Sequence, residues 1–331
     1  MPADLPQPHR IAIAVNPTSG AGRGRRLGAQ VGARLAASGH ELVDVAGTSA
    51  AECLDRSRAA VARGLDAFVV VGGDGMVNLG ANAVAGTDVP LGIVAAGTGN
   101  DIAASLGLPV HDVAAALSVL EAGLAAAAAG ATGATAATGD GVRRIDAVQG
   151  TANGGAPRWF VGVLCGGFDA LVNERANGWS WPRGRMRYNL AIARELPLFH
   201  PLPYELELDG EPWRTEAVLV AVGNGTRYGG GMRITPDAVY DDGLVDVLVA
   251  GPLSRSALVR VFPRVFDGSH VTHPAVTIRR ARRVRLSTPG VVAYADGERF
   301  GAMPVDLRVV PGALRILAAA STGASDPAVV A

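Results

Sequence analysis

Three short glycine-rich segments contain residue types that could hold phosphate groups. They are NPTSGAG at Asn16–Gly22, GGDGMVN at Gly72–Asn78 and GTGND at Gly97–Asp101. Backbone N–H groups hold triphosphate oxygens well, and only glycine lets the backbone approach those oxygens closely. A helix that begins at such a loop adds the positive end of its dipole. These segments are therefore candidates for a phosphate-binding site.

Four polar side chains within these segments could take part in the chemistry. Ser19, Thr98 and Asn100 could add side-chain hydrogen-bond donors for phosphate. The negative charge of Asp74 would repel phosphate, so we expect Asp74 to have a role other than direct phosphate binding. It could orient a Mg²⁺-bound water or accept a proton.

Each segment taken alone has an ordinary structural explanation. GGDG is as often a tight turn as a phosphate loop, NPTSG is commonly an Asn-Pro turn, and GTGN could cap a helix. Their combination is more specific, because each follows an apolar run of strand length: Ile11–Val15, Ala67–Val71 and Leu91–Ala95. Continuous apolar runs are typical of strands buried on both faces. Three glycine loops at the ends of three buried strands favour a nucleotide site.

The surrounding pattern predicts the elements that position these loops. Glu41–Val45 is a further expected strand, and the apolar spacing predicts helices over Gly24–Ser38, Ala50–Arg63 and Asn78–Ala85. Strands alternating with helices indicate a doubly wound α/β domain, whose ligands bind at the carboxyl ends of the strands. The low-complexity stretch Ala125–Gly141 is expected to be a mobile loop near a domain junction.

From Arg143 onward the chain changes to short β-rich segments separated by turns, which predicts an antiparallel β domain. The expected strands are Trp159–Cys165, Tyr204–Leu208, Ala217–Val222, Leu244–Val249, Ala275–Ile278 and Val284–Ser287. We therefore expect an α/β domain over residues 1–142 and a β-rich domain over residues 143–305. Residues 306–320 could return to the first domain, and residues 321–331 are expected to be a disordered tail.

Composition excludes several classes of protein. The 331 residues contain no lysine, which rules out a P-loop, a protein kinase and Schiff-base chemistry. The net charge of zero gives no overall field to attract nucleic acid, so no nucleic-acid partner is expected. Cys53 and Cys165 match no metal-ligand spacing and indicate reduced thiols in a cytoplasmic protein. We see no signal peptide and no transmembrane segment, so any membrane contact is expected at the surface.

Five ordered motifs together resemble the diacylglycerol kinase catalytic family, which includes bacterial soluble lipid kinases and sphingosine kinases. The motifs are NPTSG, VVVGGDG–VN, GTGND–A, DDG and DGE, and they extend from Ile11 to Leu317. The resemblance implies an α/β nucleotide domain of the NAD kinase-like, doubly wound type, followed by an antiparallel β-rich C-terminal domain. It also implies an active site between the two domains, with ATP as co-substrate and Mg²⁺ as cofactor.

The resemblance assigns roles to individual residues. Glu298 aligns with the general base, and Asp74 is the rival base. Asp242 would be a magnesium ligand by its carboxylate, and Val239 and Leu244 by their main-chain carbonyl oxygens. The nucleotide would be bound by residues of the three loops and by a threonine after the second strand: Asn16, Pro17, Thr18, Ser19, Gly20, Thr48, Gly72, Gly73, Asp74, Gly75, Met76, Val77, Asn78, Gly97, Thr98, Asn100 and Asp101.

Three positions depart from the family pattern. Met76 replaces a threonine, Leu79 replaces a glutamate and Ala104 replaces an arginine. Losing the threonine hydroxyl removes a phosphate donor, and losing the glutamate removes a charge near the metal. These departures leave open a slower enzyme or a weakly active nucleotide- or lipid-binding protein.

The acceptor is argued separately, because GGDG also occurs in NAD kinases and phosphofructokinases. Diacylglycerol is the first choice, and a sphingoid base, NAD or another soluble alcohol stays open. Trp179 and Trp181 alternate with Arg183, Arg185 and Arg187. Such a segment suits the inner membrane surface or, equally, an aromatic contact beneath a solvated basic face. The sequence leaves open whether the chain forms a homodimer.

Overall fold

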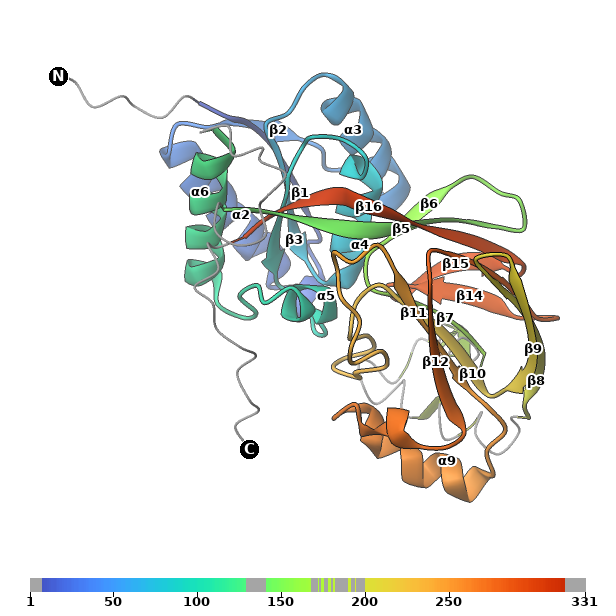
Figure 1. Ribbon diagram of the computed structural model, residues 1–331. Helices are drawn as coiled ribbons and strands as arrows, with labels where there is room; N and C mark the ends of the chain where they lie inside the picture. The colour runs from blue at the N-terminus through green and yellow to red at the C-terminus, as the bar shows by residue number, and fades with distance from the viewer. Residues whose placement is uncertain are drawn as a thin grey trace. The chain divides into compact units, whose positions relative to one another are not determined.

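The computed structural model describes residues 8–128, 141–167 and 200–318, together with a few positions between residues 172 and 194. The chain forms two compact units (Figure 1). The first consists of Met1–Ile145 and Gly312–Ala331, and the second is Asp146–Pro311. Strands β5 (Val142–Ala152) and β16 (Val305–Leu317) each run from one unit into the other along the chain.

The first unit is built on a parallel sheet. Its strands are β1 (Arg10–Val15), β2 (Glu41–Asp44), β3 (Ala67–Gly72) and β4 (Leu91–Ala95), in the order β2-β1-β3-β4. The final part of β16 continues this sheet, with Ile316 beside Leu91. Every residue of β3 and β4 is buried, as expected for central strands covered on both faces.

Helices cover both faces of this sheet (Figure 1). On one face lie α2 (Gly24–Ala37) and α6 (Val113–Ala128), whose Leu35 and Leu120 join one core with Val69 of β3. The other face carries α3 (Ala50–Ala62) and α4 (Asp74–Val84), and Gly80 of α4 packs closely on Val70 and Leu91. Two short helices, α1 (Ser19–Gly22) and α5 (Asp101–Ser105), follow β1 and β4. This arrangement confirms the α/β fold predicted for the N-terminal part of the chain.

Two local expectations were wrong. The helix expected over Asn78–Ala85 begins four residues earlier, at Asp74, because extended Gly73 serves as its N-cap. The stretch expected as a loop over Ala125–Gly141 begins inside helix α6, which includes Ala125 to Ala128. Alanine has the highest intrinsic helix propensity, so a run of alanines continues a helix that tertiary packing has already formed. The rest of that stretch, residues 129–140, lies outside the described residues, as do residues 321–331.

The second unit packs two antiparallel sheets against each other. One has the strand order β12-β11-β10-β7-β14-β15. Its strands are β7 (Val163–Gly167), β10 (Leu219–Gly223), β11 (Val245–Ala250), β12 (Val276–Ala281), β14 (Val292–Ala295) and β15 (Glu298–Ala302). The other contains the first part of β16 beside β13 (Arg283–Ser287), then β8 (Leu202–Leu208) and β9 (Glu211–Ala217), with β5 and β6 (Arg158–Phe160) off this path. This confirms the antiparallel β-rich C-terminal domain.

The six-stranded sheet of the second unit is apolar on both faces. Val220, Val222 and Val247 face the core between the two sheets. Ala221 and Leu248 face a separate apolar layer that also includes Phe262 and Val265. That layer is formed by α9 (Arg255–Val261), η1 (Phe262–Val265) and η2 (Ser269–Thr272), which the sequence analysis did not identify.

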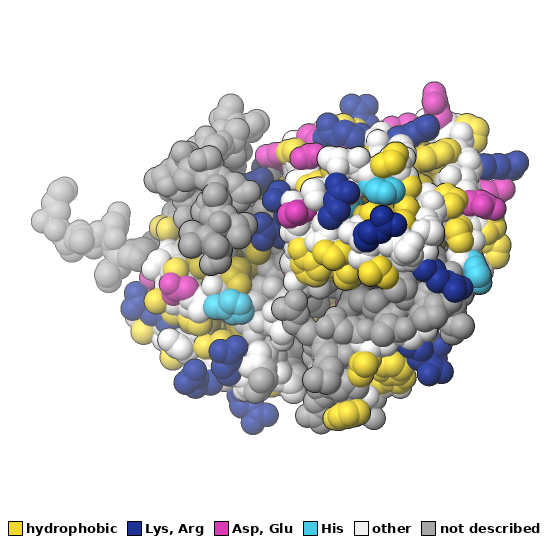
Figure 2. All heavy atoms as spheres, turned by 90° about the horizontal axis from the view of Figure 1, so that it is seen from below, with side chains coloured by type: hydrophobic (Ala, Val, Ile, Leu, Met, Phe, Trp, Pro, Cys, Tyr) yellow, Lys and Arg dark blue, Asp and Glu magenta, His cyan; other side chains and the backbone are white. Residues whose placement is uncertain are grey.

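Charged side chains of both signs are mixed on one face of the molecule. Figure 2 shows basic and acidic side chains interspersed among apolar ones on the face that it presents, as expected for a chain of zero net charge. Within the described residues, none of the helices is both long and apolar enough to cross a bilayer.

Candidate active site

The three glycine loops meet at the carboxyl ends of β1, β3 and β4. A Cβ atom added to Gly97 would overlap the Cα of Gly73, so these two backbones lie against each other. A Cβ on Gly20 would lie 2.5 Å from the carbonyl oxygen of Ala96, which is closer than side chains tolerate. The same test places the Cβ of Asn16 3.5 Å from a Cβ on Gly72. The structure therefore brings the three predicted phosphate loops together, and a larger residue would not fit at Gly20 or Gly97.

Helix α4 begins at the centre of this group of loops. Its N-cap residue, Gly73, is extended, with φ −96° and ψ −162°. The carbonyl of Gly73 accepts hydrogen bonds from Met76 N (2.9 Å) and Val77 N (3.3 Å), which closes the first turn. The first N–H groups of a helix have no partner within the helix. Those of Asp74 and Gly75 thus form, with the helix dipole, a site suited to an anion.

The first loop keeps its shape through its own polar side chains. Asn16 Oδ1 accepts hydrogen bonds from Thr18 N (3.0 Å) and Thr18 Oγ1 (2.8 Å). Ser19 Oγ donates to the carbonyl of Asn16 at 3.0 Å. The backbone N–H of Asn16 donates to the carbonyl of Val71 at the end of β3, which ties this loop to the neighbouring strand.

Asn100 shapes the third loop from the inside. It has left-handed backbone angles (φ 57°), and only 1% of its surface is exposed. Its Oδ1 accepts from Gly97 N at 2.8 Å, and its Nδ2 donates to the Gly97 carbonyl at 3.0 Å. Both ends of the amide are thus engaged within the loop. Thr98, in contrast, is exposed and offers its hydroxyl to solvent.

Asp74 links the second loop to the third. Its Oδ1 accepts a hydrogen bond from Ile102 N at 2.9 Å, so the carboxylate serves the first turn of α5. Within the described residues, its Oδ2 accepts no hydrogen bond. Oδ1 thus helps to hold the second and third loops together. Oδ2 is not used for this purpose by the described residues.

Thr48 is engaged elsewhere. Its N and Oγ1 both donate to Glu52 Oε2 at 2.7 Å. These hydrogen bonds are the main reason that the pKa of Glu52 is lowered. Ser49 is the N-cap of α3 and accepts from Glu52 N at 3.2 Å, which completes a capping arrangement of the Ser-x-x-Glu type. In this structure Thr48 belongs to the start of α3.

The two atypical residues of the GGDG segment are packing residues. Met76 and Leu79 are 9% and 8% exposed. The side chain of Met76 lies over Gly72, where a Cβ would overlap its Cβ and Cγ. A methionine here fills space beneath the loop and offers phosphate no hydroxyl.

Glu298 stands on a β-hairpin of the second unit. It is exposed at the start of β15, after the turn Asp296–Gly297, whose φ angles are 52° and 81°. Two consecutive positive φ values are typical of the type I′ turn that joins antiparallel strands. The hairpin interpretation of DGE is thus correct for its backbone, and it leaves the carboxylate of Glu298 accessible.

A buried polar network supports this hairpin. Asp296 is 7% exposed and accepts hydrogen bonds from Val161 N (2.9 Å) and Gly162 N (2.8 Å). Asn224 Nδ2 donates to the carbonyls of Val161 (2.8 Å) and Asp146 (3.0 Å). Sequence reasoning missed Asp296, Asn224 and Asp146 as site-supporting residues. The signal of Asp296 and Asn224 was weak, since an Asp or Asn beside glycine is first interpreted as a turn residue. Asp146 carried no motif in the sequence.

The expected metal loop holds an arginine instead of a ligand set. Asp242 Oδ1 accepts from Leu244 N at 2.9 Å, and its Oδ2 pairs with Arg280. Arg280 Nε also contacts Asp246 Oδ1 at 3.1 Å. Val239 is 45% exposed. The described residues include no group of three or more Asp, Glu, His or Cys arranged to hold a metal ion. In this arrangement the guanidinium of Arg280 supplies a positive charge at Asp242, and Mg²⁺ binding by Asp242 and the main-chain carbonyls of Val239 and Leu244 stays a prediction.

Burial changes the acidity of the neighbouring carboxylate. The pKa of Asp246 is raised to about 6, first by burial and then by the charge of Asp237. Loss of hydration disfavours the charged form of a carboxyl group, which explains the direction. The contact with Arg280 opposes this effect by keeping a positive charge at the carboxylate.

A helix-covered parallel sheet with three convergent glycine loops, followed by an antiparallel β sandwich, defines a class of kinases. Two family models match the chain in that order. Residues 10–132 match the diacylglycerol kinase catalytic domain, and residues 162–318 match the YegS C-terminal NAD kinase beta sandwich-like domain.

Relatives agree with this assignment. A diacylglycerol kinase of Mycobacterium tuberculosis is 39% identical over 309 residues, which is 93% of this chain and 94% of that protein. A diacylglycerol kinase of Bacillus subtilis is 27% identical, over 89% of this chain and 91% of that one. A solved structure of a putative diacylglycerol kinase from Bacillus anthracis has the same fold, with a TM-score of 0.70 and 22% identity over 94% and 98% of the chains. The chain belongs to the diacylglycerol kinase family.

Proposed function

We propose that the protein transfers the γ-phosphoryl group of ATP to a lipid hydroxyl, with diacylglycerol as the acceptor and phosphatidic acid as the product. The observation that carries this proposal is the close approach of Gly20, Gly73 and Gly97 at the ends of three strands. This arrangement aligns backbone N–H groups and the start of α4 on one region. The relatives named as diacylglycerol kinases favour the same chemistry.

The phosphate groups would be bound mainly by the backbone. The chain has no lysine, and Asn16, Ser19 and Asn100 make hydrogen bonds within their own loops. Thr98 remains as an exposed side-chain donor. Preorganised N–H groups stabilise developing charge without reorganisation during the reaction. Mg²⁺ bound to the triphosphate would neutralise further charge, and Asp74 Oδ2 is the carboxylate oxygen of these loops open to it.

Glu298 is the proposed general base for the acceptor hydroxyl. Its exposed carboxylate is held on a hairpin whose turn is fixed by Asp296. Asp74 is the rival base, although its Oδ1 is occupied by Ile102 N. A base must reach the proton that it accepts, so the more accessible carboxylate is favoured. In this proposal the first unit binds ATP and the second unit binds the acceptor.

An enclosed apolar cavity in the second unit supports an acceptor with hydrocarbon chains. It lies between the six-stranded sheet and α9, and it has a volume of about 70 Å³. It is lined almost entirely by apolar side chains, among them Met232, Ile234, Leu248, Leu258 and Phe262. Val259 of α9 and Phe266, which follows η1, are 56% and 43% exposed. Exposed apolar side chains of this kind suit contact with a membrane.

We further propose a cytoplasmic protein that works at the inner membrane surface. Trp181 is 78% exposed, as an interfacial tryptophan would be. The sequence also predicted arginines at this surface. They lie outside the described residues: Arg183, Arg185 and Arg187.

The test is a phosphoryl-transfer assay with labelled ATP and Mg²⁺. The acceptors are diacylglycerol, sphingosine, ceramide and NAD, each offered separately, with the lipids in mixed micelles. Labelled phosphatidic acid is the expected product. Labelled NAD phosphate alone would contradict the lipid proposal, and ATP binding without transfer to any acceptor would favour a nucleotide-binding protein. The latter outcome is the second candidate, because Met76 offers no hydroxyl at the phosphate loop.

A further inference from the structure

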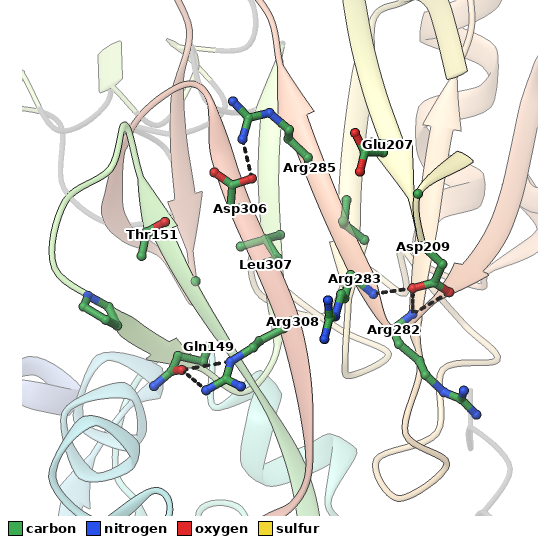
Figure 3. A pocket seen from close by; sticks show the side chains of 14 residues that line it. Gln149, Thr151, Glu207, Asp209, Arg282, Arg283, Arg285, Asp306, Leu307 and Arg308 are labelled. Atoms are coloured by element: carbon green, nitrogen blue, oxygen red, sulfur yellow. Dashed lines mark hydrogen bonds and ion pairs between the residues drawn. The ribbon is translucent and has the colours of Figure 1, made fainter. Parts of the chain in front are cut away.

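We propose that Arg283 and Arg308 form a binding site for a phosphate-type anion on the outer face of the β5–β16–β13–β8 sheet. The face carries an open groove of about 1080 Å³, lined entirely by residues of the second unit. Figure 3 shows its labelled side chains on neighbouring strands. None of them belongs to the glycine loops, the Glu298 hairpin or the apolar cavity, so this site is independent of the proposed kinase reaction.

The two arginines stand directly opposite each other. The register of the antiparallel strands β13 and β16 pairs Arg283 with Arg308, and both side chains are exposed. Opposed residues in such a pair have Cβ atoms about 4.5–5.5 Å apart, and two like charges at this separation destabilise the sheet. The arrangement therefore has a cost in stability that an anion held between the guanidinium groups would remove.

Neither positive charge is neutralised by the surrounding chain. Arg308 directs Nε and Nη2 to Gln149 Oε1 at 3.1 and 2.6 Å, and this partner is a neutral amide. Within the described residues, no acidic side chain forms an ion pair with Arg283 or Arg308. Asp209, which lies opposite Arg283 on the neighbouring side of β13, accepts hydrogen bonds from the backbone N–H groups of Arg282 and Arg283 at 2.8 to 3.1 Å.

The remaining charges of the groove lie mainly in the next row along the strands. Arg285 pairs with Asp306 at 2.7 Å, and the register places Glu207 opposite Arg285 on β8. This row has two acidic groups and one basic group. The row of Arg283 and Arg308 has two basic groups and one acidic group, Asp209, so it keeps a net positive charge. Sign is therefore sorted along the strands, which directs an anion to one end of the groove.

One further donor lies beside the pair. Gln149 accepts through Oε1 from Arg308, which leaves its Nε2 hydrogens for another partner. Two guanidinium groups and an amide are donors that recognise tetrahedral phosphate oxygens. The same chemistry would recognise inorganic phosphate or the headgroup of an anionic phospholipid.

The experiment compares the wild type with the single variants Arg283→Gln and Arg308→Gln. Arg214→Gln is the matched control, because Arg214 is exposed on β9 of the same unit but pairs with Glu205 outside the groove. Inorganic phosphate is titrated calorimetrically into each full-length protein. Phosphate also competes for the glycine loops, so the deciding quantity is the difference between variants. We expect each groove variant to bind phosphate at this site about tenfold or more weakly than the control.

A second arm distinguishes the source of the phosphate. The same proteins are pelleted with phosphatidylglycerol vesicles and, separately, with neutral phosphatidylcholine vesicles. Loss of binding to the anionic vesicles in the groove variants identifies a lipid headgroup, whereas a response to inorganic phosphate alone identifies a soluble ligand. Equal behaviour of the groove variants and the control in both arms would overturn the proposal.

The denaturation midpoint provides a further test, because a purely structural role of Arg283 would not make the midpoint depend on phosphate. Because the paired charges repel each other, Arg283→Gln should unfold at a higher denaturant concentration than the wild type in phosphate-free buffer. Added phosphate should raise the midpoint of the wild type and narrow this difference. A lower midpoint for Arg283→Gln in phosphate-free buffer would mean that the pair stabilises the sheet by itself, and the proposal would be wrong.

Discussion

Polar side chains in the glycine loops form hydrogen bonds mainly with the loops themselves. Asn16 holds Thr18, Asn100 holds Gly97, and Asp74 holds the first turn of α5. Residues of this kind were expected to contact phosphate, and in the structure they position the backbone that would do so. Loop geometry is therefore sensitive to small changes at the glycines where the loops touch.

Gly97→Ala is predicted to abolish ATP binding. The new methyl group would overlap the Cα of Gly73, and neither backbone can move without displacing the start of α4. Overpacking of this kind costs about 1–3 kcal/mol of stability. Calorimetric titration with ATP and urea denaturation would measure both effects. The control is Gly32→Ala in α2, where the new methyl group would make only ordinary van der Waals contacts with Leu42 and Ile13 and the helix should gain up to about 1 kcal/mol. Unchanged ATP affinity in Gly97→Ala would contradict the phosphate site.

Glu298→Gln is predicted to lower kcat by about 10²- to 10⁴-fold, because the amide cannot accept the hydroxyl proton. ATP affinity should remain, since Glu298 lies in the second unit and the glycine loops in the first. Steady-state kinetics and an ATP titration would separate the two quantities. Glu216→Gln, at an exposed position of β9, is the matched control. If turnover survives in Glu298→Gln, the base is Asp74, and Asp74→Asn should then be inactive.

At the scale of elements, periodicity and turn residues predicted much of the fold. Strands β1, β3 and β4 were found at the expected residues, because continuous apolar runs that end in glycine turns are typical of buried strands. Helix α9 was missed, since it is short and its partners come from distant strands. The role of Arg280 could not be predicted either. Its pairing with Asp242 depends on the register of β11 and β12, which joins residues far apart in sequence.

Helix α6 was also only partly predicted from the sequence, and its packing on the sheet can be tested. Its C-terminal alanines looked like a loop, yet its apolar residues pack on the sheet. Leu120 is 1% exposed and lies over Gly92 of β4. Leu120→Ala should lower the free energy of unfolding by about 2–5 kcal/mol, because it leaves a cavity in the core. Ser118→Ala, on the exposed side of the same helix, should change it by less than about 0.5 kcal/mol. Urea denaturation would compare them, and equal losses would show that α6 does not cover the sheet.

At the scale of the whole molecule, His270 should make stability depend on pH. It is 2% exposed beneath α9, and burial is the main reason that its pKa is lowered; Arg264 lowers it further, whereas Asp267 and backbone hydrogen bonds oppose the shift. Its folded pKa lies below the unfolded value of about 6.5, so the unfolded chain binds more protons between the two. The contribution of His270 is complete above about pH 6.5 and is lost as the pH falls towards the folded pKa.

This pH dependence can be measured by denaturant unfolding at several pH values. In His270→Gln the free energy of unfolding should fall less steeply below about pH 6.5 than in the wild type. An unchanged slope in His270→Gln would show that this histidine does not titrate differently on folding.

The path of β16 has a consequence for how the protein is made. Leu317 belongs to the core of the first unit, Ala313 accepts a hydrogen bond from Gly86, and Arg315 pairs with Asp88. A ribosome delivers these residues after the whole second unit, although domains usually fold as soon as they emerge. The sheet of the N-terminal segment therefore stays incomplete at its β4 edge until the last part of β16 has left the ribosome. During that interval the exposed edge would be a natural place for a chaperone to bind.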